Sequence, residues 1–440
     1  MKIPDLHQIY PFQNNYDIRE NGIKIISKAD KSYIFDNVGN KILDALSGLW
    51  CVNIGYGRKE LAEAARFQMT ELPYCNNFFK TTNSPSEKLS EELVKISAGN
   101  LNNVFFGTSG SDANDSIVQF IRQYWNILDK KEKKVIISLD NAYHGSTLVA
   151  ASLGGMKPMH SASSLPLPGF VHIMPPYYYK FGSGQTQEDF GIFSANELEN
   201  KILEIGPENV AAFFIEPIQG GGGAIIPPDN YLPLIKNICK KYDVLLCVDE
   251  VITGFGRTGN WFASSAYNLE PDFITLAKGL TSGYAPLSAV MVGDRIAKVL
   301  LDKEIKLQHG YTFTGHPVSC AVALENIRIL REENLIESSR EVSKILENSL
   351  NYIKDKSNLI GDIRIKGMIG AIQIRKEILL EDKKISYRYS KLLDFFISNG
   401  LIVDVMENGI LFAPSLCWKE SEVHEFTQKI ISGLDFLTRN

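Results

Sequence analysis

Two residues that could act together chemically follow two apolar runs in the middle of the chain. Asp249 comes directly after the apolar residues 244–248, and Lys278 comes directly after residues 273–277. Short apolar runs of this kind are typical of buried parallel strands. Because open α/β sheets bind their ligands at the carboxyl ends of such strands, we expect the carboxylate and the amine to meet at one edge of a sheet.

This pair of groups suits one kind of cofactor chemistry. A lysine amine can hold an aldehyde as a Schiff base, and a carboxylate can keep a pyridine nitrogen protonated, as pyridoxal phosphate requires. Taken alone, Asp249 is better explained as a loop acid or a helix cap, and Lys278 as a solvated charge. Two complementary groups at two strand ends, joined by the glycine-rich segment 254–259, are much harder to explain by chance.

A phosphate would need its own binding site, and residues 103–111 offer one. They lead from an apolar run into a predicted helix whose apolar residues have helical spacing: Ile117, Phe120, Ile121, Tyr124, Trp125 and Leu128. Ser109, Gly110 and Ser111 stand where that helix begins, so that backbone N–H groups and a hydroxyl could approach a dianion. Viewed alone, the motif is better explained as a serine-capped helix that binds nothing, but beside Asp249 and Lys278 the phosphate site is favoured.

The whole sequence resembles one family of enzymes. Beside the segment 248–279, the motifs that carry the resemblance are GLWCVNIGYG at residues 48–57, YHGST at 143–147, EPIQG at 216–220 and TFTGHP at 312–317. They resemble the class III aminotransferases, pyridoxal phosphate enzymes of fold type I, and within them the branch that acts on amines or putrescine with pyruvate. The resemblance implies an α/β fold similar to aspartate aminotransferase, with a mainly parallel sheet in a large domain (residues 60–325). A small α+β domain would combine residues 1–59 and 326–440.

The resemblance also implies roles for individual residues. Lys278 and Asp249 would be the catalytic pair, with Tyr143 stacked on one face of the cofactor ring, Val251 on the other and Gln219 near its phenolic oxygen. The full set of expected cofactor contacts is Ser109, Gly110, Ser111, Tyr143, His144, Glu216, Gln219, Asp249, Val251, Lys278, Tyr311 and Thr312. Related enzymes receive the threonine from a partner subunit, so the resemblance implies a homodimer with its active site at the interface, and leaves open a tetramer.

The expected substrate pocket is mostly apolar and suits an amine without an α-carboxylate. Its residues by resemblance are Phe12, Leu49, Trp50, Phe78, Gly221, Arg257 and Asp404, with Phe78 and Tyr311 supplied by the partner. Asp404 departs from the pattern, because related enzymes carry there a mobile arginine that pairs with the keto acid. Arg257 or Arg364 could replace that arginine, or Asp404 could bind a cationic amine. Asp404 could also be an ordinary loop charge, or the loop could align differently.

We therefore expect a ping-pong transaminase that moves an amino group from an amine, diamine or omega-amino acid to a keto acid such as pyruvate, through pyridoxamine phosphate. Ser288 stands where the branch usually has glycine and is similar to the serine of diaminopelargonate synthases, so a biosynthetic aminotransferase of that kind is the alternative. An aminomutase or a non-catalytic binding protein on the same fold is a third possibility. Intact Asp249 and Lys278 argue against an inactive scaffold.

Composition agrees with a large enzyme of two domains. The chain has 440 residues, of which 44% are hydrophobic, and a formal net charge of −5. That charge does not indicate a nucleic-acid surface, and the longest apolar runs are too short to span a membrane. The six cysteines lack metal-ligand spacing, which predicts no metal site and a reducing, cytoplasmic location.

The rest of the chain alternates predicted strands and helices, which favours a mainly parallel sheet covered by helices. Residues 161–193 are rich in Pro, Gly, Ser and Tyr, and we expect a long functional or interface loop there. After about Asn326 the chain changes to charged helices around two short apolar segments, at residues 370–374 and 409–412.

Overall fold

The computed structural model describes residues 7–97, 99–302, 305–407 and 409–439. At its centre lies a seven-stranded sheet in which β10 runs antiparallel to both of its neighbours and the five strands from β9 to β6 are parallel. In spatial order the strands are β4 (Leu101–Gly107), β10 (Ser288–Gly293), β9 (Phe273–Leu276), β8 (Leu245–Asp249), β7 (Val210–Ile215), β5 (Val135–Leu139) and β6 (Phe170–Ile173).

Helices cover both faces of this sheet, which explains why a central strand such as β7 is apolar throughout. In β7, Ala212 and Phe214 pack into one apolar cluster, and Phe213 and Ile215 pack into another on the opposite face. The first cluster contains residues of α5 (Gly110–Ile127), α6 (Leu148–Leu153) and α12 (Asp294–Asp302). The second contains residues of α3 (Lys59–Glu71), α4 (Ser84–Ile96), α9 (Gln187–Ile205), α10 (Tyr231–Lys241) and α13 (Pro317–Glu332).

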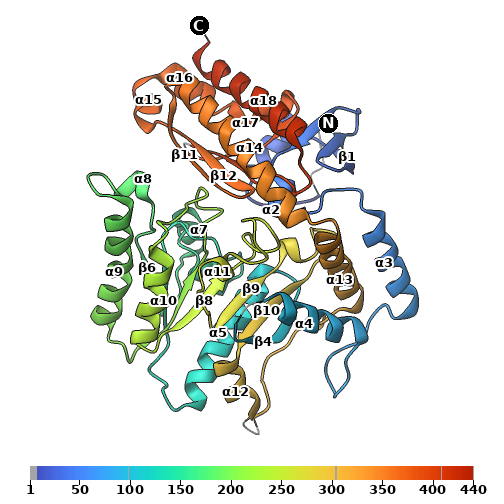
Figure 1. Cartoon of the computed structure of the whole chain (residues 1–440), viewed down its shortest axis with the longest axis vertical. Coiled ribbons are helices and arrows are strands. Elements are labelled where there is room, and N and C mark those ends of the chain that lie inside the picture. The colour runs from blue at the N-terminus through green and yellow to red at the C-terminus, as the bar shows by residue number, and fades with distance from the viewer. Residues whose placement is uncertain (1–6, 98, 303–304, 408, 440) are drawn as a thin grey trace.

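The two ends of the chain share a smaller part of the molecule, above the large sheet in Figure 1. One sheet joins β1 (Ile26–Asp30), β2 (Tyr33–Asp36) and β3 (Lys41–Asp44) to β13 (Leu401–Ile402), which runs parallel to β3. A second joins β11 (Ile360–Lys366), β12 (Ile369–Ile374), β15 (Gly409–Phe412) and β14 (Asp404–Val405). The pairing of β3 with β13 agrees with the expected union of the two chain ends, while the division at residues 60 and 325 stays a prediction.

The helices of this smaller part are amphipathic and place their apolar residues in the same core as the second cluster. They are α14 (Leu335–Lys356), α15 (Lys376–Glu381), α16 (Lys383–Tyr389), α17 (Leu392–Ser398) and α18 (Glu420–Thr438). The remaining helices are short: α1 (Asn15–Asn21), α2 (Ser47–Trp50), α7 (Lys157–Ser163), α8 (Tyr178–Phe181), α11 (Ala263–Ala266) and the 3₁₀ turn η1 (Lys278–Leu280).

Most predicted strands are confirmed with shifted ends, but the long loop is not. Residues 161–193 contain the end of α7, the strand β6, the helix α8 and the start of α9. The strand β6 pairs only with β5 and is half-buried at its two central positions, so it lacks the continuous apolar run of a central strand. Pro168, Gly169, Pro175 and Pro176 flank it and gave the segment the composition of a loop.

Within the described residues, no helix is long and apolar enough to cross a membrane. The same part of the chain contains no group of three or more His, Cys, Asp or Glu side chains placed to hold a metal ion.

Candidate active site

The carboxyl ends of β8 and β9 carry the two residues that the sequence singled out. Asp249 is the last residue of β8, and Lys278 begins the turn η1 after β9. Both line a cavity of about 150 Å³. The other residues that line it are Gly110, Ser111, Tyr143, His144, Gly145, Glu216, Val251, Ile252 and Ala277. The amine and the carboxylate therefore face one space, as two parallel strand ends predict.

Three hydrogen-bond contacts fix the buried carboxylate of Asp249. Its Oδ2 accepts from Asn114 Nδ2 at 2.9 Å and lies 2.9 Å from His144 Nδ1, while its Oδ1 accepts from the N–H of Val251 at 3.0 Å. His144 is itself buried, with its ring edge-on to Phe214 at 5.0 Å between centroids. The carboxylate is held in one orientation before any ligand binds.

Asn114 was missed by the sequence interpretation. It is fully buried on α5, accepts a hydrogen bond from Thr275 Oγ1 at 2.5 Å and donates to the main-chain oxygen of His144 at 2.6 Å. Its position gave a signal, because residue 114 falls three positions before Ile117 and seven before Ile121, on the apolar stripe of the helix. A polar residue on such a stripe needs a buried partner.

Lys278 combines an unusual backbone with a partly buried amine. Its φ of 43° is left-handed, and its Nζ lies 5.3 Å from the centroid of the Trp50 ring. Removal from water lowers the pKa of the amine, and the negative charge of Asp249 opposes that effect. A lowered pKa leaves more of the amine neutral, the form that can accept a proton.

Glu216 is a buried carboxylate that connects two neighbouring loops. Its Oε1 accepts from the N–H of Tyr143 at 3.0 Å, and its Oε2 accepts from the N–H of Gly220 at 3.0 Å. Burial raises the pKa of Glu216 to about 7, with a further increase from Asp249 that His144 opposes. Both carboxylate oxygens therefore act as acceptors for main-chain groups beside the cavity.

The first turn of α5 has the form expected of a phosphate site. Ser109 caps the helix, because its Oγ accepts from the N–H of Asp112 at 3.2 Å and the Asp112 carboxylate accepts from the N–H of Ser109. Gly110 and Ser111 line the cavity, and among the described residues no acceptor contacts their N–H groups. A helix N-terminus with free N–H groups attracts an anion.

The residues expected around a cofactor ring are divided between the cavity and its surroundings. Tyr143 and Val251 line the cavity. Gly221 backs Tyr143, since a Cβ on that glycine would lie 3.2 Å from the Tyr143 Cβ. Gln219 is buried, and its Nε2 donates to the main-chain oxygen of Asp140 at 3.0 Å, so one of its two amide N–H donors is already in use.

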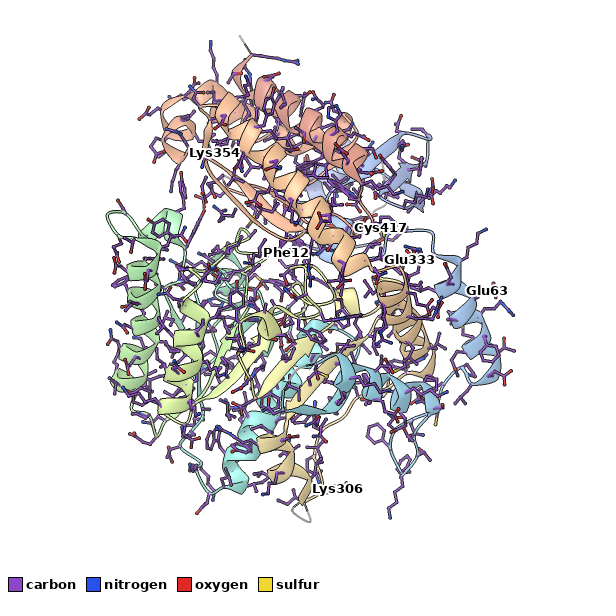
Figure 2. The ribbon with its side chains drawn as sticks, in the orientation of Figure 1. Phe12, Glu63, Lys306, Glu333, Lys354 and Cys417 are labelled. Atoms are coloured by element: carbon purple, nitrogen blue, oxygen red, sulfur yellow. The ribbon has the colours of Figure 1, made fainter. Side chains whose placement is uncertain are left out.

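The residues expected in the substrate pocket are less closely gathered. Trp50 is buried against Ile252 and near Lys278, whereas Leu49 is 60% exposed, Phe12 76% and Phe78 43%. In Figure 2, Phe12 lies between the C-terminal helices and the large sheet. Asp404 is half-buried on β14 and is not among the residues that line the cavity.

Arg257 and Arg364 are both engaged in bonds inside the protein. Arg257 is fully buried, and its guanidinium donates to Asn53 Oδ1 at 2.6 Å and to the main-chain oxygens of Met368 and Pro414. Burial lowers the pKa of Arg257 to about 10. Arg364 pairs with Asp362 at 2.6 Å. Neither guanidinium is among the groups that line the cavity, contrary to the idea that one of them meets a keto acid there.

Tyr311 and Thr312 lie on the segment that leads to α13. Tyr311 is half-buried, and its hydroxyl donates to the main-chain oxygen of Asp112 at 3.0 Å in the same chain. Thr312 is exposed, and its main-chain oxygen accepts from the Tyr74 hydroxyl at 2.9 Å. Neither residue lines the cavity within one chain.

The groups that do line the cavity fit pyridoxal phosphate. An amine and a fixed carboxylate lie at two strand ends, and free N–H groups of a helix N-terminus face the same space. An aromatic side chain, Tyr143, and an apolar one, Val251, complete the lining that a ring would need.

Comparisons with known proteins agree with this site. A family model described as aminotransferase class-III matches residues 17–434. The putrescine–pyruvate aminotransferase of Pseudomonas aeruginosa is 45% identical over 426 residues, which cover 95% of this chain and 92% of the relative. A vanillin aminotransferase of Capsicum chinense is 43% identical over 349 residues, covering 78% and 76% of the two chains.

Solved structures lead to the same family. An (S)-enantioselective omega-transaminase from Thermomicrobium roseum superposes with a TM-score of 0.95 at 36% identity, covering 98% of this chain and 97% of the other. The omega-transaminase of Pseudomonas jessenii in complex with PMP gives a TM-score of 0.92 at 36% identity, covering 98% and 96%. Because the family model spans most of the sequence, this chain belongs to the class-III aminotransferases, which use pyridoxal phosphate as their cofactor.

Proposed function

We propose that the protein transfers an amino group from an amine, a diamine or an omega-amino acid to a keto acid such as pyruvate. The observation that carries the proposal is the joint exposure of Lys278 and Asp249 to one cavity, beside the buried ring of Trp50. Its support from relatives is the 45% identity to a putrescine–pyruvate aminotransferase and the likeness to omega-transaminases.

Each residue of the site has a task in this reaction. When bound, pyridoxal phosphate supplies a conjugated electron sink for the negative charge that develops on the substrate carbon. Lys278 Nζ would hold the cofactor, and as a free amine it could accept a proton from the substrate carbon and return it. Asp249 would favour a protonated ring nitrogen, and Asn114 and His144 fix the orientation of Asp249.

The remaining groups bind and orient. The N–H groups of Gly110 and Ser111 bind the phosphate, with the positive end of the α5 dipole behind them. Tyr143 and Val251 line the cavity and would contact the two faces of the ring. Trp50 and Ile252 belong to one apolar cluster, which favours a substrate without an α-carboxylate beside the reactive amine.

We also propose that two copies of the chain complete the site, with the partner subunit's Thr312 at the phosphate. Apolar side chains are exposed near that residue: Tyr74 at 42%, Phe78 at 43%, Phe79 at 90% and Phe313 at 52%. A cluster of exposed aromatic rings marks a surface that another protein covers. The six free thiols of the structure favour a reducing, cytoplasmic location.

The alternative of a diaminopelargonate-type enzyme loses its sequence argument. Ser288 is fully buried, and its Oγ donates to Asp112 Oδ1 at 2.9 Å. It therefore supports the cap of α5 and is not among the residues that line the cavity. An aminomutase or a non-catalytic binding protein likewise has no observation in its favour.

A donor panel tests the reaction. Purified enzyme with added cofactor is incubated with pyruvate and, in turn, putrescine, n-butylamine, β-alanine, taurine and an aromatic amine, and alanine formation is measured. We expect alanine from at least one donor in the wild type and none from Lys278→Ala. If no donor yields alanine from pyruvate, glutamate from 2-oxoglutarate or the matching amine from an aldehyde acceptor, the proposed function is wrong.

Mixed dimers test whether Thr312 acts on the partner's site. In a dimer of Lys278→Ala with Thr312→Ala, one site keeps its own Lys278 and would receive an intact threonine from the other chain. We therefore expect the mixed dimer to regain the cofactor affinity and about half the activity of the wild type. If Thr312 acts within its own chain, mixing restores neither property.

A further inference from the structure

Asp404 lies on a strand whose alternation fixes the direction of its side chain. In the pairing of β14 with β15, Asp404 is opposite Leu411 and Val405 is opposite Ile410. Residues directly opposite each other place their side chains on the same face of a sheet. Leu411 belongs to the apolar cluster that contains Trp50, whereas Ile410 belongs to the main core, with Val405 packed against it. The Asp404 side chain therefore shares the face of Leu411.

The residues on either side of Asp404 in the chain indicate the same orientation of its side chain. Ile402 and Met406, two positions before and two after Asp404, both pack against the cluster of Trp50. Strand residues two apart share a face, so the carboxylate lies between two side chains that contact this cluster. The same cluster includes Ile252, which also lines the cavity of Lys278. One apolar cluster thus contacts the strand of Asp404 and, through Ile252, the cavity of the reactive amine.

Within the part of the chain that the structure describes, the charge on Asp404 has no counter-ion. Among the described residues, no Lys, Arg or His side chain makes an ion pair with it, and its ionised form is favoured only by the N–H of Val405. Burial raises the pKa of this carboxyl. The other charged side chain beside Tyr389, which Asp404 also faces, is the acidic Glu407. Arg257 and Arg364 are bonded elsewhere.

A carboxylate that is partly withdrawn from water without a cation is destabilised, and a cationic ligand would relieve that cost. The cluster that it shares with the cavity is apolar, so a ligand that reaches both would need methylene groups between its cation and its reactive end. We propose that Asp404 binds the distal ammonium of a short aliphatic diamine, whose methylenes contact Trp50 and Met406 while its other amine reacts beside Lys278. This assignment rests on the proposed transaminase function and narrows its donor.

The test compares a diamine with a monoamine of the same carbon chain. Wild type and Asp404→Asn holoenzymes are assayed with pyruvate and either putrescine or n-butylamine, and kcat and KM are measured for each donor. A hydrogen bond between two charged groups contributes roughly a 10- to 100-fold preference. We expect the KM for putrescine to rise by about that factor in the variant, while the KM for n-butylamine stays level or falls.

Glu407→Gln is the matched control, because it removes an exposed carboxylate three residues away, outside β14. We expect it to change neither KM. Equal changes for both donors in Asp404→Asn, or no change for either, would overturn the assignment, since Asp404 would then act only on the fold. A wild type that uses n-butylamine but not putrescine would also overturn it. A wild type that uses no amine donor at all with any acceptor would instead refute the proposed function.

Discussion

The carboxylates of the large sheet and of the smaller part of the molecule differ in the hydrogen bonds that they accept. Asp249 and Glu216, at the ends of the large sheet, each accept hydrogen bonds through both oxygens. Asp404, on β14 of the smaller part, accepts none from any side chain among the described residues, and Leu49 and Phe12, which were also expected in the substrate pocket, are largely exposed. One chain therefore fixes the carboxylates of its cofactor side with its own groups, whereas on the substrate side the Asp404 carboxylate is left for a ligand.

The largest expected effect comes from the reactive amine. Lys278→Ala removes both the attachment of the cofactor and the group that moves the proton, so we expect turnover to fall by about 10⁴-fold or more. The visible absorbance of the lysine-bound cofactor should disappear with it. Lys356→Ala, which changes an exposed lysine of α14, should behave as the wild type. Full turnover by Lys278→Ala would disprove the mechanism.

Removal of the charge on Asp249 comes second. Asp249→Asn keeps the shape of the side chain but no longer favours a protonated ring nitrogen, and we expect kcat to fall about 10³-fold. The loss should occur with every donor, because the ring nitrogen takes part in each turnover. Asn114→Ala keeps the charge of Asp249 but removes a hydrogen bond that orients the carboxylate. We therefore expect a smaller fall in kcat, about 10- to 100-fold. An Asn114→Ala loss as large as that of Asp249→Asn would contradict this order.

The contrast between the two sides also explains what the sequence could predict. The positions of Asp249 and Lys278 followed from two local patterns, an apolar run and the polar residue after it, and neither pattern depends on distant residues. The phosphate site at the start of α5 was predictable in the same way, because small residues stand there between a strand and a helix. These parts of the site were therefore predictable from short segments.

The other side depends on contacts between distant segments. Arg257, in a glycine-rich motif, was expected in the substrate pocket, but its guanidinium meets the main-chain oxygens of Met368 and Pro414, more than a hundred positions away. Asn114 has its role only because α5 packs against the ends of β8 and β9. No local pattern carries such information, since each partner comes from another element.

The third prediction concerns the pH dependence of Glu216. Its pKa is about 7 in the folded protein and 4.5 ordinarily, so the folded state binds the extra proton between these values. The stability contributed by Glu216 is therefore greatest below pH 4.5 and falls by about 3 kcal/mol as pH rises to 7. Glu216→Gln cannot titrate, so the difference in melting temperature between wild-type and variant apoenzyme should change across this range. If this difference in melting temperature does not change with pH, burial does not raise the pKa of Glu216.

Glu216→Gln should also weaken the reaction. Its amide NH₂ must face one of two main-chain donors, the N–H of Tyr143 or that of Gly220, where the carboxylate offered an acceptor. We expect a loss of about 10- to 100-fold in kcat/KM, through displacement of the Tyr143 ring. Glu250→Gln is a control of comparable burial, because its carboxylate accepts from Ala263 and Ser264 and does not line the cavity.

The smallest expected effect tests whether the smaller part of the molecule influences the cofactor side at all. Arg364 of β11 donates to the main-chain oxygens of Gly223 at 2.8 Å and Ala224 at 3.2 Å, on the loop whose Gly221 backs Tyr143. Arg364→Lys keeps the charge but cannot make both of these hydrogen bonds. We therefore expect kcat/KM to fall about tenfold for every donor.

Arg375→Lys is the matched control, because Arg375 also donates to a main-chain oxygen, that of Ile360, without contacting the glycine loop. If Arg364→Lys shifts the visible spectrum of the bound cofactor and Arg375→Lys does not, the glycine loop transmits the position of β11 to the Tyr143 ring. Equal effects of the two variants would mean that both arginines only stabilise the smaller part. The two sides of the cavity would then be independent, with Asp404 selecting the donor without altering the chemistry.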